Sequence, residues 1–468
     1  MKKTFTLIAM LTVCLTTLAQ QTEKDELPWY VFNYQKVAIR LFNEVLKGQT
    51  DNVCFSPFSA QIALSMLQNG AVGDTQELMK QVLLTNGTSE QLNDYNRSTI
   101  RDLTYRPQFT YYENSWMSKE EQQKTFDALW PICEIANSIW YRPDVELCEP
   151  FEQAMREYYD AGTAPVAFDT QEGIDIVNGW VNEKTHGLIP SIYNEPQSDD
   201  LAIVLINALY LKAAWAVPFW KELTKKEPFH LEDGTKIQTD MMYVSDPAFT
   251  TAQTDAFRCV NIPYNNHFCM TVFIPAEGYE LPAITYEDWT AAIQATENRY
   301  SNDVGVKLKM PKFSIEGGCN LIPVLKAMGM GGILEGEGGD FTGMCLQNKA
   351  ISKIFQLDKI IVDEEGTEAA AVTVIEATDS EPEEPQKVID FFIDRPFYFT
   401  IENLKTHTIL FMGKVMNPGG EVTHQPTGIQ VATPHQPDAP VYDLSGRRLQ
   451  HIPAHGIYIQ DGKKYVRP

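Results

Sequence analysis

A nearly continuous apolar run at residues 201–211, LAIVLINALYL, constrains the fold of this chain more than any other feature. A strand with one face in water alternates apolar and polar side chains, whereas a strand covered on both faces is apolar almost throughout. The run therefore predicts an interior strand of a sheet that has packing layers on both sides. Residues 29–48 and 321–328 carry apolar side chains at helical spacing. Because these elements follow no regular strand–helix alternation, the sequence predicts an α+β fold rather than a nucleotide-binding parallel sheet.

Further elements are expected on both sides of this run. Residues 52–59 predict a short buried strand that leads into a helix, and Asp74 with Glu77 resembles a capping box at the start of the next helix. The stretch 104–125 is rich in Tyr and Gln without clear periodicity, so we expect it to be irregular or inserted. Residues 391–401 are expected to form one of the last strands.

The charge and the absence of known motifs exclude several classes of function. The 468 residues include 62 acidic and 38 basic side chains, a formal net charge of −24, and so acidic a surface repels nucleic acids and anionic membranes. The sequence has no H-E-x-x-H, no G-x-S-x-G, no phosphate-binding loop and no dinucleotide glycine fingerprint. Its eight histidines are scattered along the chain. We therefore expect no enzyme activity, no metal site and no cofactor.

Residues 1–19 have the pattern of a secretory signal peptide. Two lysines precede an apolar stretch at 5–18, which ends at the small residue Ala19. The protein is therefore expected to be secreted and to act outside the cell or at its surface. Cys14 leaves a lipid anchor open as an alternative. No later run reaches the roughly 18 apolar residues that a membrane-spanning helix needs, so no membrane span is expected.

Residues 363–385 carry the pattern that is most informative about function. The first half is small and β-branched, which disfavours a helix, and the second half is acidic and contains two prolines. With a period of two, one face of a strand carries Thr367, Ala369, Ala371, Thr373, Ile375 and Ala377. The pattern alone fits an ordinary half-buried strand followed by a surface loop. It also fits a segment that adopts two states, one exposed and one buried.

At this segment the chain resembles the serpins, and the resemblance extends over about residues 29–418. The residues that resemble the hinge of inhibitory serpins are Glu364, Glu365, Gly366, Thr367, Glu368, Ala369, Ala370 and Ala371. The residues that resemble the shutter of the family are Asn52, Ser56, Pro57, Ser59, Asn207 and Gln356. Further family landmarks lie at Trp180, Trp215, Phe219, 310–313, 394–397 and 411–418.

One shutter residue departs from the family pattern. Gln356 stands where many serpins have a histidine. Because a Gln side chain can still donate and accept hydrogen bonds, we expect the hydrogen bonds of the shutter to be altered rather than lost.

The resemblance implies a serpin fold of three β-sheets and about nine helices with an exposed reactive loop. It implies a suicide-substrate inhibitor of an extracellular serine, or alternatively cysteine, protease. The protease would attack the loop and form a covalent acyl complex, and the cleaved loop would enter the large sheet. The inhibitor is expected to be a monomer. A non-inhibitory serpin that acts as a carrier or chaperone is the alternative.

The reactive bond is placed by spacing from the hinge. Family spacing from Gly366 puts the acyl-side residue at Ser380, with the bond to Glu381. Because the loop is about five residues longer than usual for the family, its neighbours Asp379, Thr378 and Ala377 are also candidates. No Lys or Arg lies between residues 366 and 386. The expected target is therefore elastase-like, subtilisin-like or acid-directed rather than trypsin-like.

The composition changes after the residues that resemble a serpin. We expect a serpin domain at 20–418, a linker at 419–440 with four prolines, and a C-terminal tail at 441–468 with a hairpin pattern. The tail resembles the C-terminal segments of secreted Bacteroidetes proteins, which serve in sorting or surface attachment. A disordered extension is the alternative.

Overall fold

The computed structural model describes residues 29–467 with several gaps. The gaps are residues 114, 199–200, 247–248, 299–303, 335–337, 350, 368–386, 420–440, 443–447, 450–455 and 461–462. The chain divides into two compact units, residues 1–426 and 427–468. The expected signal peptide and all of the expected linker except Gly419 lie outside the described residues.

Three sheets organise the described part of the first unit. The β4 sheet has the order β11 (Phe313–Asn320), β12 (Ile351–Val362), β13 (Gly366–Thr367), β4 (Ile203–Ala214), β2 (Ile132–Tyr141) and β3 (Ala161–Pro165). The β15 sheet has the order β1 (Val53–Phe55), β16 (Thr408–Val415), β15 (Phe397–Asn403), β9 (Phe268–Pro275), β8 (Phe257–Pro263) and β7 (Thr250–Gln253). The third sheet has the order β14 (Lys387–Phe392), β10 (Val304–Pro311), β6 (Lys236–Asp246) and β5 (Lys225–His230).

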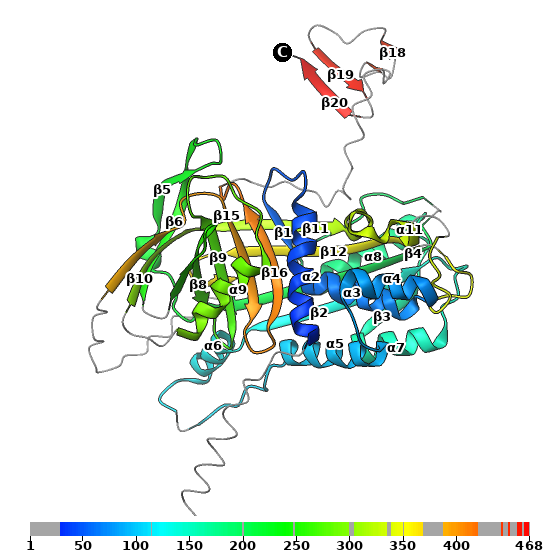
Figure 1. Ribbon diagram of the computed structural model, residues 1–468, viewed down its shortest axis with the longest axis horizontal. Helices are drawn as coiled ribbons and strands as arrows, with labels where there is room; N and C mark the ends of the chain where they lie inside the picture. The colour runs from blue at the N-terminus through cyan, green and yellow to red at the C-terminus, as the bar shows by residue number, and fades with distance from the viewer. Residues whose placement is uncertain are drawn as a thin grey trace, which may run out of the picture. The chain divides into compact units, whose positions relative to one another are not determined.

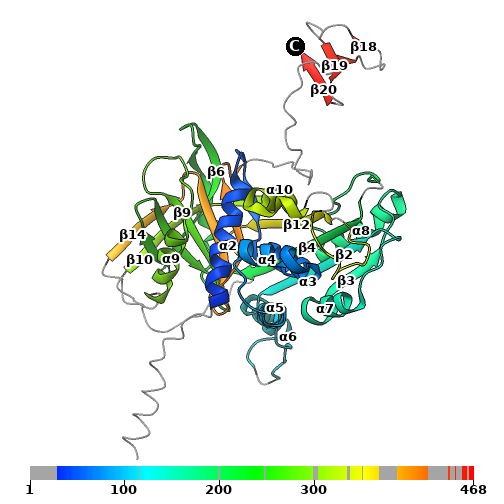
Figure 2. The same cartoon turned by 45° about the vertical axis from the view of Figure 1, so that its right-hand side comes forward.

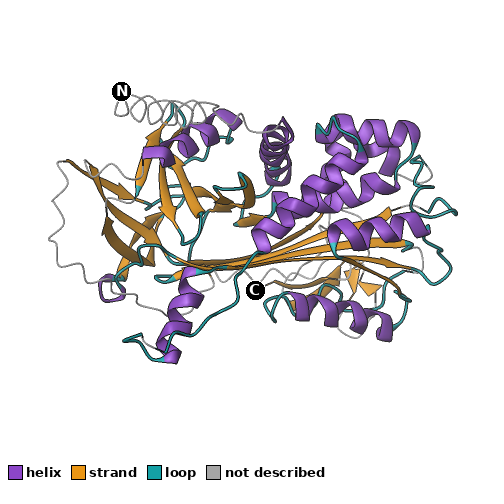
Figure 3. Cartoon of the chain, turned by 90° about the horizontal axis from the view of Figure 1, so that it is seen from below, coloured by secondary structure: helices purple, strands orange, loops and turns teal. Residues whose placement is uncertain are grey.

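Besides two short 3-10 helices, Lys221–Leu223 and Ala295–Asn298, nine helices surround these sheets among the described residues, if α10 (Leu321–Leu325), the π-helical turn Lys326–Met330 and α11 (Gly331–Leu334) are counted as one. The others are α2 (Trp29–Leu46), α3 (Pro57–Gly70), α4 (Gly73–Leu83), α5 (Ser89–Thr104), α6 (Lys119–Leu129), α7 (Glu149–Tyr159), α8 (Gln171–Lys184) and α9 (Tyr286–Gln294). Figures 1 and 2 show α3 and α4 over the long strands of the β4 sheet, and Figure 3 shows helices on both sides of those strands.

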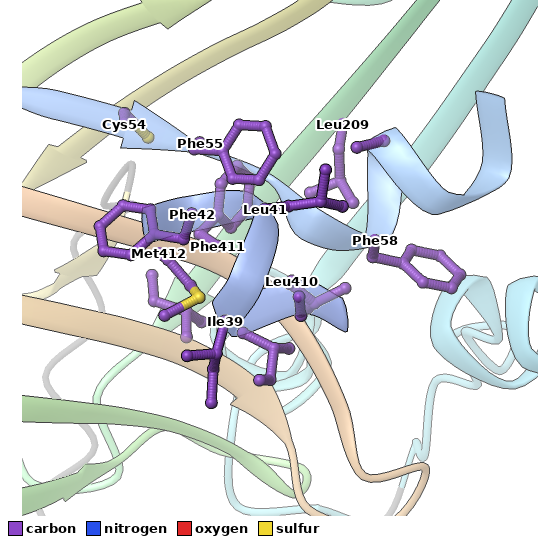
Figure 4. Packing of buried hydrophobic residues seen from close by; sticks show 14 of the residues in the cluster. Ile39, Leu41, Phe42, Cys54, Phe55, Phe58, Leu209, Leu410, Phe411 and Met412 are labelled. Atoms are coloured by element: carbon purple, nitrogen blue, oxygen red, sulfur yellow. The ribbon is translucent and has the colours of Figure 1, made fainter. Parts of the chain in front are cut away.

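Strand β4 is the interior strand that the apolar run predicts. Its alternate side chains enter two separate cores: Leu205 and Leu209 pack into the core that contains α3, whereas Val204 and Ile206 pack into the core that contains α8. Burial on both faces explains why the strand needs apolar residues at consecutive positions. Figure 4 shows part of the larger core, where residues of α2, β1, α3, β4 and β16 meet.

Three expected elements were wrong in detail. The stretch 104–125, expected to be irregular or inserted, becomes helical at Lys119, where α6 begins after the capping residue Ser118. Helix α4 begins at Gly73 after Val72, which makes no side-chain cap, so Asp74 lies inside the first turn and forms no capping box. The single strand expected at 391–401 is two strands, β14 and β15. Between them, Asp394 accepts a hydrogen bond through its backbone carbonyl from the His230 N–H at 2.7 Å.

The second unit contains a small antiparallel sheet in its described residues. The strand order is β18 (Arg448–Leu449), β17 (Val441–Tyr442), β19 (Gly456–Gln460) and β20 (Lys463–Arg467). Strands β19 and β20 pair from Gly456 opposite Arg467 to Gln460 opposite Lys463.

Candidate functional site

The candidate site is the seam along which the parallel strands β4 and β12 meet. At its closed end the two strands pair directly, from Ile351 opposite Ile203 to Leu357 opposite Ala208. At its open end β13 lies between them, and Thr367 pairs with Val362 on one side and Ala213 on the other. Between the two ends, residues 358–361 and 209–212 are not paired with each other. The two strands are thus paired at one end and separated at the other, where the hinge segment lies between them.

Gly366 is required by the close approach of the hinge to β4. A Cβ atom at this position would lie 2.1 Å from the Ala213 carbonyl oxygen, and the residue has a φ of +157°. An L side chain cannot occupy that space without moving the backbone of β4. The glycine therefore lets the chain turn from β12 back into the open end of the seam.

An aromatic cluster supports the open end. The Trp215 ring stacks on the Tyr264 ring with centroids 4.1 Å apart. The Trp215 indole N–H donates to the Asp363 carbonyl at 2.9 Å, and its backbone N–H donates to the Glu365 carbonyl at 2.9 Å. The Tyr264 hydroxyl hydrogen-bonds the Thr367 hydroxyl. These bonds join the hinge segment to the end of β4 and to the residue that follows β8.

The acidic hinge residues are also held by specific partners. The Glu364 carboxylate accepts hydrogen bonds from Lys312 Nζ at 2.7 Å and from Thr224 Oγ1 at 2.8 Å. Burial raises the pKa of Glu364, but the bonds from Lys312 and Thr224 outweigh that effect and hold it below the ordinary value. Glu365 forms an ion pair with Lys221, which lies on the surface. The open end therefore has its charges paired.

A row of amide side chains crosses the sheet at the closed end. Asn207 on β4 lies opposite Asn137 on β2 and opposite Gln356 on β12. The Asn207 side-chain N–H donates to Asn137 Oδ1, and Asn137 Nδ2 donates to the Tyr159 carbonyl at 2.8 Å. Asn207 Oδ1 has no hydrogen-bond partner within the described part of the chain.

Asp358 is a buried carboxyl one residue beyond the last β4–β12 pair of the closed end, and the sequence analysis missed it. The side chain is 1 % exposed, and its Oδ2 accepts a 2.6 Å hydrogen bond from Gln356 Nε2. Burial raises its pKa to about 7, and hydrogen bonds from the Gln356 side chain and the Ser56 backbone offset part of that effect. Gln356 Oε1 and Asp358 Oδ1 find no partner among the described residues. Because Asp358 lies two residues after Gln356, both side chains are on the same face of the strand.

The start of α3 adjoins this face of the sheet. Ser56 caps the helix, since its Oγ accepts from the Ser59 N–H at 3.1 Å, and Pro57 occupies the first turn. Ser59 Oγ is buried and, as far as the structure describes the chain, unpartnered. Four of the eight buried side-chain atoms without a partner in the described residues therefore belong to Ser59, Asn207, Gln356 and Asp358.

The structure places the remaining candidate residues elsewhere or leaves them undescribed. Asn52 binds the end of β16: its Nδ2 donates to the Asn417 carbonyl at 2.8 Å, and its Oδ1 accepts from the Met416 N–H at 2.7 Å. The candidates outside the described residues are Glu368, Ala369, Ala370, Ala371, Ala377, Thr378, Asp379, Ser380 and Glu381. The shutter residues other than Asn52 therefore gather at the closed end, and the described hinge residues gather at the open end.

Within the described ranges, no group of three or more His, Cys, Asp or Glu side chains has the arrangement to hold a metal ion. None of the described helices combines the length and hydrophobicity needed to cross a membrane.

Comparison with known proteins adds independent findings. The sequence model of one family, described as "Serpin (serine protease inhibitor)", matches residues 33–418. Iripin-8 of Ixodes ricinus is 29% identical over 423 residues, which cover 88% of this chain and 99% of the relative. A serpin-like protein of Thermococcus kodakarensis is 32% identical over 379 residues, covering 80% and 82%. The native-state crystal structure of the thermophilic serpin tengpin is 25% identical, covers 85% of this chain and 96% of its own, and superposes with a TM-score of 0.70.

Proposed function

The chain belongs to the serpin family, whose members are protease inhibitors rather than enzymes, and we propose that it traps a target protease by inserting its cleaved reactive loop into the β4 sheet. The fold is the serpin fold, and family membership implies a protease as the partner. In the proposed mechanism the protease cuts the loop and remains attached as an acyl-enzyme. The released segment then becomes a new strand between β4 and β12.

The position of β13 is the observation that carries this proposal. Gly366 and Thr367 already lie between β4 and β12: Thr367 pairs with both strands, and Gly366 pairs with β4. If the antiparallel register continues, each residue further along the loop faces one residue further back along both strands. The tenth residue after Thr367, residue 377, then faces Ile203, which is the tenth before Ala213 and the first of β4. On β12 it faces residue 352, the tenth before Val362, so the two strands offer matching lengths.

The same register assigns the faces of the inserted strand. Thr367 is 2 % exposed, and its neighbours Ala213 and Val362 belong to the core that contains α3. The residues at every second position after Thr367, which are small or apolar, would enter that core, whereas Glu368 and Glu376 would lie on the opposite face. Alanine loses almost no side-chain entropy on burial, so this composition suits a segment that must move from solvent into the sheet.

Insertion would also move the protease. Ten residues at about 3.3 Å each carry the acyl-linked enzyme about 33 Å along the sheet. Such a displacement pulls the acylated residue out of the catalytic site of the protease, whose own folded state is stabilised by only about 5–15 kcal/mol. Distortion of that site would prevent hydrolysis of the acyl bond.

We propose an elastase-like, subtilisin-like or acid-directed protease as the target. The proposal is supported by the absence of Lys and Arg from residues 366–386, since a trypsin-like enzyme requires a basic residue before the cut. The proposed bond follows Ser380, with cuts after residues 377–379 as the alternatives in the lengthened loop.

We further propose that the protein acts outside the cell or at its surface, as a monomer. The signal-like composition of residues 1–19 supports export. The small antiparallel sheet of the second unit is compatible with a sorting or attachment role for residues 441–468.

The test is incubation with elastase, subtilisin, a glutamate-specific protease and trypsin, followed by a denaturing gel. The expected result is a covalent adduct with one of the first three and none with trypsin, and sequencing of the released fragment identifies the bond. A loop nicked by a non-target protease should raise the melting temperature of the chain. Clipping without an adduct by every protease and no rise in melting temperature would contradict the inhibitor proposal and favour a carrier or chaperone.

A further inference from the structure

Three buried hydrogen-bond acceptors lie at the closed end of the seam without a donor in the described part of the chain. Asn207 Oδ1, Gln356 Oε1 and Asp358 Oδ1 are buried and have no partner among the residues described. Gln356 lies opposite Asn207 on the neighbouring strand and is bonded to Asp358 on its own strand. A buried acceptor without a donor destabilises the folded state, so three together are unusual in a native sheet. A proton on Asp358 would supply a donor for one of these acceptors.

The described groups that face Asp358 provide hydrogen bonds from the Gln356 side chain and the Ser56 backbone but no positive charge. Two titratable groups act on it from neighbouring elements, the thiols of Cys54 on β1 and Cys319 on β11. Burial and the nearby Asp358 carboxyl raise the pKa of both thiols, which therefore stay neutral. Among the described residues, no cation pairs with Asp358. The start of α3 brings the Ser56 backbone and the neutral Ser59 hydroxyl to this face of the sheet, the β4 residues on the same face are apolar or amide, and α10 carries no titratable residue.

We propose that Asp358 is a positioning residue for loop insertion: its carboxyl is protonated while the seam is closed, and loss of that proton loosens the direct pairing of β4 and β12. The link to inhibition rests on the proposed function, whereas the effect on the seam does not. The proton lets Asp358 donate to one of the unpartnered acceptors beside it. Without the proton, a buried charge with no cation beside it lies next to the paired strands until they separate and admit water.

The sign of the pH effect follows from burial. Burial raises the pKa of Asp358 from 3.8 to about 7 in the closed seam, and water returns it toward the ordinary value when the strands separate. The closed seam is therefore stabilised by the proton at low pH. That stabilisation is lost as the pH rises through 7.

A second buried carboxyl provides the matched control. Burial also raises the pKa of Glu402, on β15, to about 7. However, Glu402 accepts hydrogen bonds from Thr271, Trp289 and Thr400 at 2.8, 3.0 and 3.4 Å, and it lies in a different sheet. Its titration should affect overall stability without acting on the seam.

The test is amide hydrogen exchange of the full chain at pH 5.5 and 8.5, corrected for the intrinsic pH dependence of exchange. The amides of residues 204–208 and 353–357 report opening of the closed end, and those of β9 serve as the reference. Wild-type protection at the closed end should fall by about 30-fold at pH 8.5, because 1.5 pH units separate 5.5 from the pKa near 7 and each unit is tenfold. Asp358→Asn, which keeps the shape and adds a permanent donor, should remove this fall, and Glu402→Gln should keep it.

Equal wild-type protection at both pH values would overturn the proposal, and this measurement needs no variant. A pH-dependent loss that persists in Asp358→Asn, or that disappears only in Glu402→Gln, would overturn it as well. The rate at which a synthetic peptide of residues 367–377 enters the sheet provides the functional readout, with the same expected pH dependence. If the peptide never enters, loop insertion is wrong, while the exchange data still decide the role of Asp358.

Discussion

The two ends of the β4–β12 seam differ in how well their polar groups are satisfied. At the open end the strands are already apart, β13 fills the gap, and the Glu364 carboxylate is bonded to Lys312 and Thr224. At the closed end the strands pair directly, but Asn207 and Asp358 each keep a buried oxygen without a partner among the described residues. The resistance to insertion is therefore concentrated where the backbone is paired and the side chains are least satisfied. A new strand can start at the open end without breaking any β4–β12 pair.

The two ends should also respond to pH in opposite directions. The hydrogen bonds at Glu364 hold its pKa below the ordinary value, so the open end loses stabilisation when the pH falls. The closed end contains Asp358, whose pKa is raised, and loses stabilisation when the pH rises. Both ends are therefore expected to be fully stabilised only at pH values between the pKa of Glu364 and the pKa of Asp358.

The largest expected effect comes from blocking the open end with Thr367→Arg. Thr367 is 2 % exposed and lies between Val362 and Ala213, so the strand cannot enter without burying an unpaired cation, which costs several kcal/mol. The protease should then cleave the loop and escape, and the yield of covalent adduct should fall more than tenfold on a denaturing gel. Thr235→Arg, in an exposed turn, is the control and should leave the yield unchanged. An undiminished adduct with Thr367→Arg would contradict loop insertion.

A smaller effect is expected from Trp215→Ala, which removes the support of the open end. The side chain is 1 % exposed, and truncation of a buried aromatic costs about 3–5 kcal/mol in the free energy of unfolding, measured by urea denaturation. Trp289→Ala, at a 4 % exposed tryptophan in α9, should cost a similar amount. Only Trp215→Ala should speed hydrogen exchange at Gly366 and Thr367. Equal exchange there in both variants would show that Trp215 does not hold the hinge.

Glu364→Gln tests the charge at the open end. The substitution should lower the free energy of unfolding by about 1 kcal/mol at pH 7, because Lys312 is partly in water, which screens the pair. Since the folded pKa lies below 4.5, this contribution is present above pH 4.5 and is lost as the pH falls through the folded value. Urea denaturation at pH 3 and pH 7 measures the difference. A wild-type advantage that is as large at pH 3 as at pH 7 would exclude the ion pair as its cause.

The smallest effect is expected at the closed end, from Asn207→Ala. This variant removes one oxygen that has no donor and leaves another, Asn137 Oδ1, without its donor. The number of unpartnered buried oxygens is thus unchanged, and the net cost should be about 1 kcal/mol or less. Asn137→Ala is the comparison, because it leaves the Tyr159 carbonyl and the Asn207 amide without their partners and should cost about 1–3 kcal/mol. If Asn207→Ala is the more costly of the two in urea denaturation, the closed end is better satisfied than its contacts suggest.

Several features of the site follow from local sequence. The run at 201–211 predicted an interior strand because burial on both faces requires apolar residues at successive positions, and β4 confirms it. Predictions from local sequence were wrong where the surrounding chain decides the backbone geometry. Asp74 and Glu77 have the spacing of a capping box, yet the chain enters α4 from Val72. The strand expected at 391–401 is interrupted after Phe392, at the residues that precede Pro396.

The sequence by itself determined that one strand would be buried on both faces and that a small, β-branched segment would follow an acidic turn and a glycine. Those properties depend on the periodicity and composition of short segments, so residues close together in the sequence determine them. Only the tertiary structure decided that Glu364 meets Lys312, 52 residues away, and that Asn137, Asn207 and Gln356 form one row. It also decided that Asp358 is buried, because β1 and the start of α3 cover that face of β12. The alternation of side chains along a strand defines two faces, but the elements packed against each face decide which face is buried.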